Sequence, residues 1–287
     1  MVLAVAILTG CGKDVDPNEP QGFIQIKGSD TLVNAVQEVS EAFMKEYPYV
    51  FVAVTGGGSG VGIASLINKT CDVATASREM KPKEIETAQK HGVFPKEFTV
   101  AFDGVAVIVN KDNPVDRLTI EDLNRIFTGK ATNWKEFGGK DLKMVTLSRE
   151  VSSGTHAYFK EEVVQLGKKD NHDEFSPQTL LLSSSQAIVE EVVTNESAIG
   201  YLGMGYAGDR TKSILVSKAG GEFFAPSVEE VMAKRYPLAR GLYFYTNGEP
   251  KGAAKLFMDF SMGPEGQQRF VNTGFVPIGA AGAQTGQ

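Results

Sequence analysis

Three short segments rich in glycine and hydroxyl residues have the composition of an anion site. They are Gly28-Ser29-Asp30-Thr31, Gly58-Ser59-Gly60 and Ser152-Ser153-Gly154-Thr155, and each lies between an expected strand and an expected helix. A helix N-terminus presents backbone N–H groups without intrahelical partners and a partial positive charge. Glycine lets an anion approach the backbone, and Ser or Thr adds a hydroxyl donor. These segments therefore predict hydrogen-bond donors for a small oxyanion.

Two arginines, Arg78 and Arg149, lie near these segments in the sequence and add positive charge. A tetrahedral oxyanion needs donors from several directions, and the three segments with the two arginines supply them. Plain helix capping would explain any one segment alone, because Ser, Thr and Asp are common N-caps. The combination of three segments favours a binding site.

An alternation of strands and helices is expected to position these segments. Apolar patterns predict strands at 23–26, 50–54 and 73–74, with helices in between that start near residues 31 and 60. Strand–loop–helix repeats indicate an α/β fold with a largely parallel sheet and covering helices. In such a sheet, loops at the carboxyl ends of the strands lie together, and ligands bind there.

The rest of the chain continues the pattern. A long strand is expected at 98–109, interrupted at Asp103-Gly104, and Thr119 with Asp122 predicts a capping box at the start of a helix. The remaining expected strands are 143–147, 198–202, 214–216 and 242–245, and helices are expected at 155–165, from 184 or 185 to about 195, and from 227, 250 and 264. We see no internal repeat and no transmembrane helix beyond the first residues.

Composition excludes some classes of function. The 287 residues carry a net charge of −6, which argues against non-specific binding of nucleic acid because that needs a basic surface. Cys11 and Cys71 are the only cysteines, the three histidines are scattered, and no spacing typical of a metal site occurs. We expect neither a metal nor another cofactor.

The N-terminus has the features of an exported lipoprotein. An apolar run, Val2 to Leu8, is too short to span a bilayer and is followed by Leu8-Thr9-Gly10-Cys11, which resembles a bacterial lipobox. We expect residues 1–10 to be an export signal, Cys11 to carry a lipid and residues 11–21 to be a polar tether. The basic residues that usually precede such a run are missing, which a truncated or misassigned start would explain. The alternative is a frayed apolar end with an incidental cysteine.

From Gly22 to Gly279, the order and spacing of several motifs resemble the phosphate-binding receptors of bacterial ABC phosphate importers. Besides the three segments above, with Gly57 included in the second, these motifs are Asp72-Val73-Ala74-Thr75-Ala76-Ser77-Arg78, Ile126-Phe127-Thr128-Gly129, Asn133-Trp134, Arg149 with the segment after it, and Ala198-Ile199-Gly200-Tyr201.

The resemblance implies a two-lobed fold of the type II periplasmic-binding-protein kind. Two strands would cross between the lobes, near Asp103-Gly104 and near Gly241 to Tyr245, and the lobes would close over the ligand. On this pattern residues 22–103 and 243–287 form lobe 1, and residues 104–242 form lobe 2. Closure of periplasmic binding proteins around their ligands is a general example of hinge motion.

The resemblance also implies which residues hold phosphate. The Thr31 and Leu32 amides and the Thr31 hydroxyl would bind it, together with the Ser59 hydroxyl, and Arg149 would pair with its charge. The further donors expected from these segments are Ser29, Ser153, Gly154 and Thr155.

Two departures from the family pattern concern acidic residues. In the best-known branch, an aspartate follows the serine of the third strand and accepts the proton of hydrogen phosphate, but Arg78 stands there. The acidic residue two positions after the binding arginine is replaced by Val151. A site made only of donors would not separate phosphate from sulfate, because phosphate carries a proton at neutral pH and sulfate does not.

We therefore expect a substitute carboxylate. Asp103 is the first choice, with a hinge turn as its alternative role, and Asp30 is the second, with helix capping as its alternative. Arg78 would replace lost positive charge, or pair with Glu79 or Asp103.

The expected function is that of a monomeric, non-enzymatic, extracytoplasmic receptor, periplasmic or at the cell surface. It would be anchored by lipid and hand inorganic phosphate to the permease of an ABC importer. The alternatives are a receptor for sulfate or another tetrahedral oxyanion, a phosphate-ester enzyme, and an adhesion or sensor module on the same fold. A hydrolase built on Ser153 and His156 is disfavoured, because a base one helical turn from its nucleophile is poorly placed to activate it.

Overall fold

The structure is a computed structural model of the 287-residue chain and describes residues 19–218 and 220–281. The expected export signal at 1–10, the lipidation site Cys11 and the tether as far as residue 18 lie outside the described residues. No described helix is long and apolar enough to cross a membrane.

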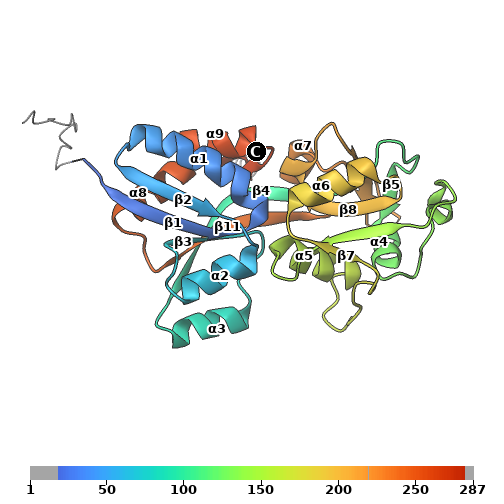
Figure 1. The fold of residues 1–287 in the computed structure, drawn as a ribbon, viewed down its shortest axis with the longest axis horizontal. Helices are drawn as coiled ribbons and strands as arrows, with labels where there is room; N and C mark the ends of the chain where they lie inside the picture. Colours follow the sequence, from blue (N-terminus) through green and yellow to red (C-terminus); the bar gives the residue numbers. More distant parts are fainter. Residues whose placement is uncertain (1–18, 219, 282–287) are drawn as a thin grey trace, which may run out of the picture.

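The first lobe is built on three parallel strands, each followed by a helix. The strands are β1 (Gly22–Gly28), β2 (Val50–Thr55) and β3 (Val73–Ala76), and the helices are α1 (Val33–Glu46), α2 (Ser59–Ile67) and α3 (Pro82–Lys90). One face of the sheet is covered by α1 together with α8 (Gly252–Met262) and α9 (Pro264–Asn272), and α2 and α3 lie on the other face (Figure 1). The expected strand–helix repeats are confirmed here.

Two long antiparallel strands connect the lobes. In β4 (Pro95–Val109), the first half pairs with β11 (Ala239–Asn247), and the second half pairs with β8 (Ala198–Gly203). The change of partner falls at Asp103-Gly104, where β4 continues without the expected interruption. β4 and β11 run through the middle of the molecule, between the two lobes (Figure 1). The fold is thus two α/β lobes joined by two strands, and the exact lobe boundaries stay predictions.

The second lobe repeats the same architecture. Its strand β6 (Val145–Arg149) pairs in parallel with β8 on one side and with β7 (Leu180–Leu182) on the other. Its helices are α4 (Ile120–Phe127), α5 (Gly154–Phe159), α6 (Ser185–Thr194) and α7 (Val228–Met232).

The remaining short elements are distributed over both lobes. The smaller strands are β5 (Arg117–Thr119), β9 (Lys212–Ser213), β10 (Leu215–Ser217) and β12 (Val276–Pro277). The short helical turns are η1 (Asp30–Leu32), η2 (Trp134–Phe137), η3 (Lys160–Val164), η4 (Met204–Tyr206) and η5 (Ile278–Ala281).

Local signals explain several helix boundaries in this lobe. The Thr119 hydroxyl accepts the amide of Asp122, and the Asp122 carboxylate accepts the amide of Thr119, so the predicted capping box is confirmed. The helix expected at 155–165 is divided, because α5 ends at Phe159 and the π-helical turn η3 follows. The side-chain amide of Asn124 donates to the carbonyl of Val164 (2.6 Å), which fixes the end of that turn.

Each lobe has its own aromatic core. In the first lobe, Phe43 of α1 meets the ring of Phe257 edge-on, with 5.3 Å between ring centroids. In the second, Phe159 stacks on Tyr201 at 3.7 Å, and the indole of buried Trp134 donates to the carbonyl of Ser197 (3.0 Å). Each lobe therefore has a packed interior, which can hold in place the residues that lie where the two lobes meet.

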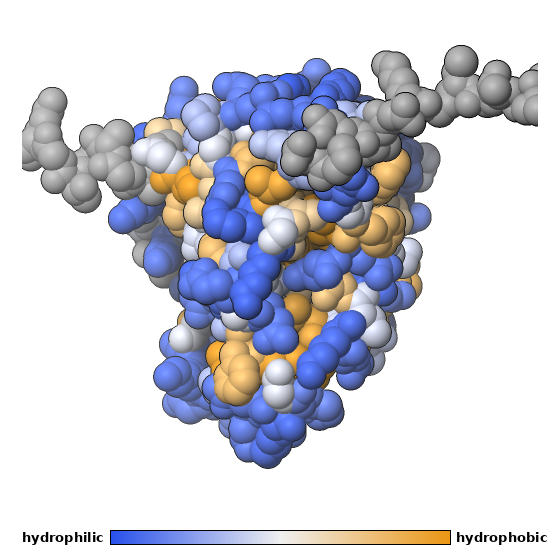
Figure 2. All heavy atoms as spheres, turned by 90° about the vertical axis from the view of Figure 1, so that its left-hand side faces the viewer, coloured by the Kyte–Doolittle hydropathy of each residue, from blue (hydrophilic) through white to orange (hydrophobic). Residues whose placement is uncertain are grey.

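The outer end of the first lobe carries scattered apolar side chains. Figure 2 shows this end as a mainly hydrophilic surface with smaller hydrophobic areas. Phe23 and Phe51 are partners in the register of β1 and β2, and each is 62% exposed. Phe51 thus makes a matched comparison for the fully buried Phe43.

We expect Phe43→Ala to lower the free energy of unfolding by about 3–5 kcal/mol, because it leaves a cavity in the first core. Phe51→Ala makes the same chemical change on the surface, and we expect it to cost about 0.5 kcal/mol or less. Urea denaturation followed by circular dichroism would measure both values. Equal losses in the two variants would contradict the core described above.

Candidate functional site

The three glycine- and hydroxyl-rich segments meet between the two lobes. The hydroxyl of Thr31, in η1, lies 2.9 Å from the hydroxyl of Thr155, in α5. The amide of Gly60 donates to the carbonyl of Ser152 (2.9 Å). A methyl group added at Gly154 would lie 2.2 Å from the Ser59 hydroxyl oxygen, which shows how closely α2 and α5 begin together. The convergence expected from the sequence is present in the structure.

Glycine is required where the second segment touches the third. Gly58 has a φ of +101°, and a methyl group there would lie 2.6 Å from the carbonyl oxygen of Ser152. A side chain would therefore both strain the backbone and push the lobes apart. The loop from the first lobe packs directly, backbone on backbone, against the loop from the second.

Several backbone amides remain available in this region. Among residues 19–218 and 220–281, no acceptor is found for the amides of Thr31, Ser59 and Gly154. The Leu32 amide, expected to be a ligand donor, instead donates to the carbonyl of Ser29 (3.0 Å), because residues 30–32 form a 3₁₀ turn. The site thus offers at least one free amide from each of the three segments.

The serine side chains of the site mainly hold its segments in position. The Ser153 hydroxyl caps α5 by accepting the amides of Thr155 and His156. The Ser59 hydroxyl accepts the amide of Ser77 (3.0 Å) at the end of β3. Ser29 is buried, and its amide donates to the carbonyl of Thr75. The ring of His156 contacts the Ser148 hydroxyl (3.0 Å), so no Ser153–His156 pair of the hydrolase type is formed.

The positive group that reaches the paired threonines is Arg240, which the sequence analysis missed. Its Nη2 lies 3.1 Å from the Thr155 hydroxyl oxygen and 3.4 Å from that of Thr31. Its Nε and Nη2 also donate to Asp103 Oδ2, at 3.0 and 2.7 Å. Arg240 is buried, and its Nη1 has no hydrogen-bond partner in the part of the chain that the structure describes. A buried guanidinium nitrogen without an acceptor is costly unless a ligand supplies one.

Asp103 faces this guanidinium from the neighbouring strand. Asp103 and Arg240 are partners in the register of β4 and β11, so both lie where the lobes join. Complete burial raises the pKa of Asp103 above its ordinary value, and the charge and hydrogen bonds of Arg240 oppose this rise. Asp103 Oδ1 also accepts the amide of Met204 (3.0 Å). The hinge turn considered for Asp103 is absent, because β4 continues through this residue.

Arg149 and Arg78 have other partners. The Arg149 guanidinium is buried and donates to Asp30 Oδ2 (2.9 Å) of the first lobe. Both terminal nitrogens of Arg78 bind the Glu84 carboxylate (2.8 and 2.7 Å), and one also donates to the carbonyl of Glu79. Arg78 thus joins the start of α3, because Glu84 sits in that helix's first turn. Its expected contribution to the anion site has no support in this geometry.

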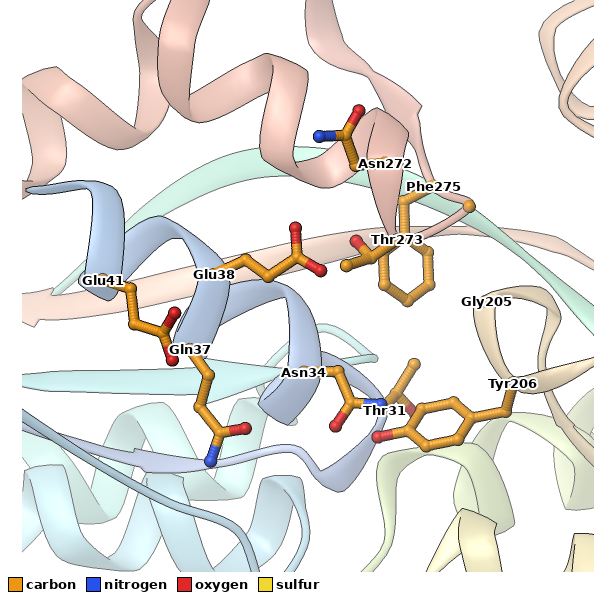
Figure 3. A pocket seen from close by; sticks show the side chains of 11 residues that line it. Thr31, Asn34, Gln37, Glu38, Glu41, Gly205, Tyr206, Asn272, Thr273 and Phe275 are labelled. Carbon is orange, nitrogen blue, oxygen red and sulfur yellow. The ribbon is translucent and has the colours of Figure 1, made fainter.

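A cavity of about 490 Å³ lies beside the site, between α1, α9 and η4. Thr31, Asn34 and Tyr206 lie close together at one end of it, and Glu38 and Glu41 of α1 line its wall (Figure 3). Carboxylates repel an anion, so we place the candidate site at the buried threonine–arginine cluster and not in this cavity.

Comparison with known proteins agrees with this architecture. Residues 15–265 match the family model of the PBP superfamily domain. The chain is 33% identical to the phosphate-binding protein PstS of Staphylococcus saprophyticus, over 88% of this chain and 78% of that protein. It is 31% identical to PstS of Pseudomonas aeruginosa, over 94% of this chain and 90% of that protein. The chain belongs to the PstS family of the PBP superfamily.

Solved structures of PstS-like proteins have the same fold. A substrate-binding protein assigned to a phosphate ABC transporter of Clostridium perfringens, solved with bound phosphate, is 31% identical with a TM-score of 0.79. That match covers 89% of this chain and 99% of the other. An ABC-type phosphate transport receptor from Vibrio cholerae is 29% identical with a TM-score of 0.70, over 88% and 99% of the two chains. These matches confirm the predicted two-lobed fold.

The sequence held one weak signal for Arg240. An arginine in an otherwise apolar and aromatic strand, 238–245, is unusual, because a charged side chain in a strand interior needs a partner. Pairing that strand with the one that contains Asp103 would have placed the two side chains side by side.

We expect Asp103→Asn to lower the free energy of unfolding by about 3–5 kcal/mol, because it leaves the Arg240 charge buried without a counter-ion. Asp116→Asn removes a carboxylate from the exposed pair with Arg117 and should cost about 1 kcal/mol or less. Urea denaturation of the two variants would measure the difference. A loss as small for Asp103 as for Asp116 would show that the buried pair is not formed.

Proposed function

We propose that this PstS-family chain is an extracytoplasmic receptor that binds inorganic phosphate and delivers it to an ABC importer. The observation that carries the proposal is the buried guanidinium of Arg240. Its Nη2 reaches two threonine hydroxyls from opposite lobes, and its Nη1 has no acceptor among the described residues. The phosphate named for the related proteins is an anion that such donors fit.

The available donors suit a tetrahedral anion. Arg240 Nη1 carries two N–H groups, and the free amides of Thr31, Ser59 and Gly154 come from three separate segments. We therefore propose Thr31, Ser59, Gly154, Thr155 and Arg240 as the phosphate ligands. Ser29 and Ser153 support the loops, and we leave Leu32 and Arg78 out because both have partners elsewhere. Arg149 stays a predicted ligand, with four of its five N–H groups directed to other partners.

The strength expected of these contacts is sufficient for a receptor. Each charge-assisted hydrogen bond is worth roughly 1.5–3 kcal/mol net. Micromolar affinity needs only about 8 kcal/mol. Five or more such contacts can supply that amount after the cost of lobe closure and ion desolvation is subtracted.

Asp103 is the carboxylate that we propose for discriminating hydrogen phosphate from sulfate. Among residues 19–218 and 220–281, its Oδ1 accepts one hydrogen bond, from the Met204 amide, so a lone pair remains for the proton of hydrogen phosphate. Sulfate has no proton to donate at neutral pH and would leave the two negative groups facing each other. Asp30, the second candidate, is held by Arg149 and the amide of Ser185.

The remaining features of the proposal concern the place of action. The lipobox-like segment ending in Cys11 and the polar stretch after it support a lipid anchor and a short tether outside the cytoplasm.

The protein would act as a monomer without catalysing a reaction, since its two lobes together supply every proposed ligand. A phosphate-ester enzyme is disfavoured, because the Ser153 hydroxyl is used as a helix cap and the His156 ring contacts Ser148.

Titration calorimetry of the chain from Gly22 onward would test the binding function. We expect phosphate to bind with micromolar or tighter affinity, which sulfate at a hundredfold excess does not abolish. Arg240→Gln should weaken phosphate binding by about a hundredfold or more, because it removes two charge-assisted donors. Arg78→Gln makes the same change at an arginine held by Glu84 and should alter the dissociation constant by about twofold or less.

A wild-type chain that binds no phosphate, or that binds sulfate equally well, would contradict the proposed ligand. A greater loss in Arg78→Gln than in Arg240→Gln would contradict the proposed site. Turnover of a phosphate ester by the purified protein would support the enzymatic alternative instead.

A further inference from the structure

We propose that the outer end of the first lobe rests on the surface of the lipid bilayer in which Cys11 would be anchored. The contact is made by three exposed phenylalanines, Phe23, Phe51 and Phe94, which together form what we term the outer-end surface. The inference rests on the lipid anchor of the proposed function and adds a second attachment to the membrane, through the folded lobe itself.

The three rings stand out by their exposure. Among the phenylalanines of the described residues, Phe23, Phe51 and Phe94 are the ones with mainly exposed side chains, at 62%, 62% and 63%. All three belong to the first lobe. Exposed apolar side chains that gather on one part of a surface indicate an interaction site, whereas scattered ones do not.

Phe23 and Phe51 are fixed beside each other at the start of two strands. The Gly22 amide donates to the carbonyl of Tyr49 (3.1 Å), which aligns the beginnings of β1 and β2 and makes the two phenylalanines register partners. Successive side chains of a strand point to opposite faces. The residues beside them in sequence, Ile24 and Val50, are buried in the core, so both phenylalanine rings point away from it.

Phe94 lies at the same end of the sheet, just before β4. Its amide donates to Asn247 Oδ1 (2.9 Å), and its carbonyl accepts the amide of Gly248 (2.8 Å), so it is held at the end of β11. Because β3 runs parallel to β1 and antiparallel to β11, β11 ends at the side where β1 begins. Figure 2 faces this end of the lobe and shows hydrophobic areas among the hydrophilic side chains.

The position of the expected tether identifies the bilayer as the partner. β1 begins at Gly22, next to Phe23, at the end of the first lobe that lies away from the second lobe (Figure 1). Ten residues, 12–21, separate Gly22 from Cys11. Even a fully extended chain of that length spans at most about 40 Å. A lipid on Cys11 therefore keeps the outer-end surface, and not the second lobe, next to the membrane.

The charges at this end suit phospholipid headgroups. A pocket of about 400 Å³ lies between the start of β3 and the end of β11, and Lys69, Lys251, Asp72 and Glu249 are its charged lining residues. Glu249 pairs with Lys96, whereas Lys69 and Lys251 are exposed and form no ion pair among the described residues. Aromatic rings that enter the interface beside lysines that attract anionic lipids are a common combination in membrane-surface contacts.

Quenching of tryptophan fluorescence by lipids with brominated acyl chains tests the contact. The lipidated full chain would be reconstituted in vesicles of phosphatidylcholine and phosphatidylglycerol. Trp134 is the only tryptophan and is buried in the second lobe, so a tryptophan introduced at the surface reports on its own position. We expect the brominated lipids to quench the added fluorescence of Phe51→Trp and of Phe94→Trp, because both side chains enter the interface.

Leu181→Trp is the matched control. It places the same reporter on β7 of the second lobe, at a side chain that is 50% exposed, and we expect its fluorescence to be unchanged by the brominated lipids. Adding Phe23→Ser and Phe94→Ser to Phe51→Trp should reduce the quenching by about twofold or more, because these changes remove apolar area that the bilayer would cover. Calorimetry should give the same phosphate affinity for every variant, which shows that each one is folded.

Three results would overturn the inference. Equal quenching in Phe51→Trp and Leu181→Trp, or none in either, would show that the outer-end surface does not meet the bilayer. A dimer of the wild-type chain that Phe51→Ser dissociates would show that a second copy covers the rings instead. A wild-type chain that binds phosphate but stays off the vesicles would overturn the anchor and this contact together. Absence of phosphate binding by a vesicle-bound chain would overturn only the proposed ligand, so the two failures are distinguishable.

Discussion

The site depends on a buried ion pair between the two strands that join the lobes. Asp103 and Arg240 face each other across β4 and β11, and both side chains are removed from solvent. Because the pair belongs to the connecting strands, it lies where Thr31 of one lobe meets Thr155 of the other. A neutralised guanidinium with unused N–H groups can then hold an anion without an excess of buried charge.

The two buried arginines have different surroundings. Nη2 of Arg240 reaches both threonine hydroxyls, and Nη1 has no acceptor among the described residues. Arg149 donates to Asp30, Ser185 and two backbone carbonyls. We assign recognition of the anion to Arg240, together with the paired threonines.

Sequence patterns predicted the parts of the fold that are set locally. Strand–helix repeats, the capping box at Thr119 and the three glycine- and hydroxyl-rich helix starts depend on residues a few positions apart, and the structure has all of them. The partners of the arginines could not be predicted in the same way. Arg240 meets Asp103 across 137 positions and Arg149 meets Asp30 across 119, so both pairs follow from strand register and lobe closure. Arg78 instead pairs with Glu84, which is six positions away in the sequence and lies in the next helix.

A crystal structure of the chain with phosphate would test the central claim most directly. The account predicts the anion in contact with Arg240 Nη1 and with the amides of Thr31, Ser59 and Gly154. An anion bound elsewhere, with Arg240 Nη1 still without an acceptor, would contradict it.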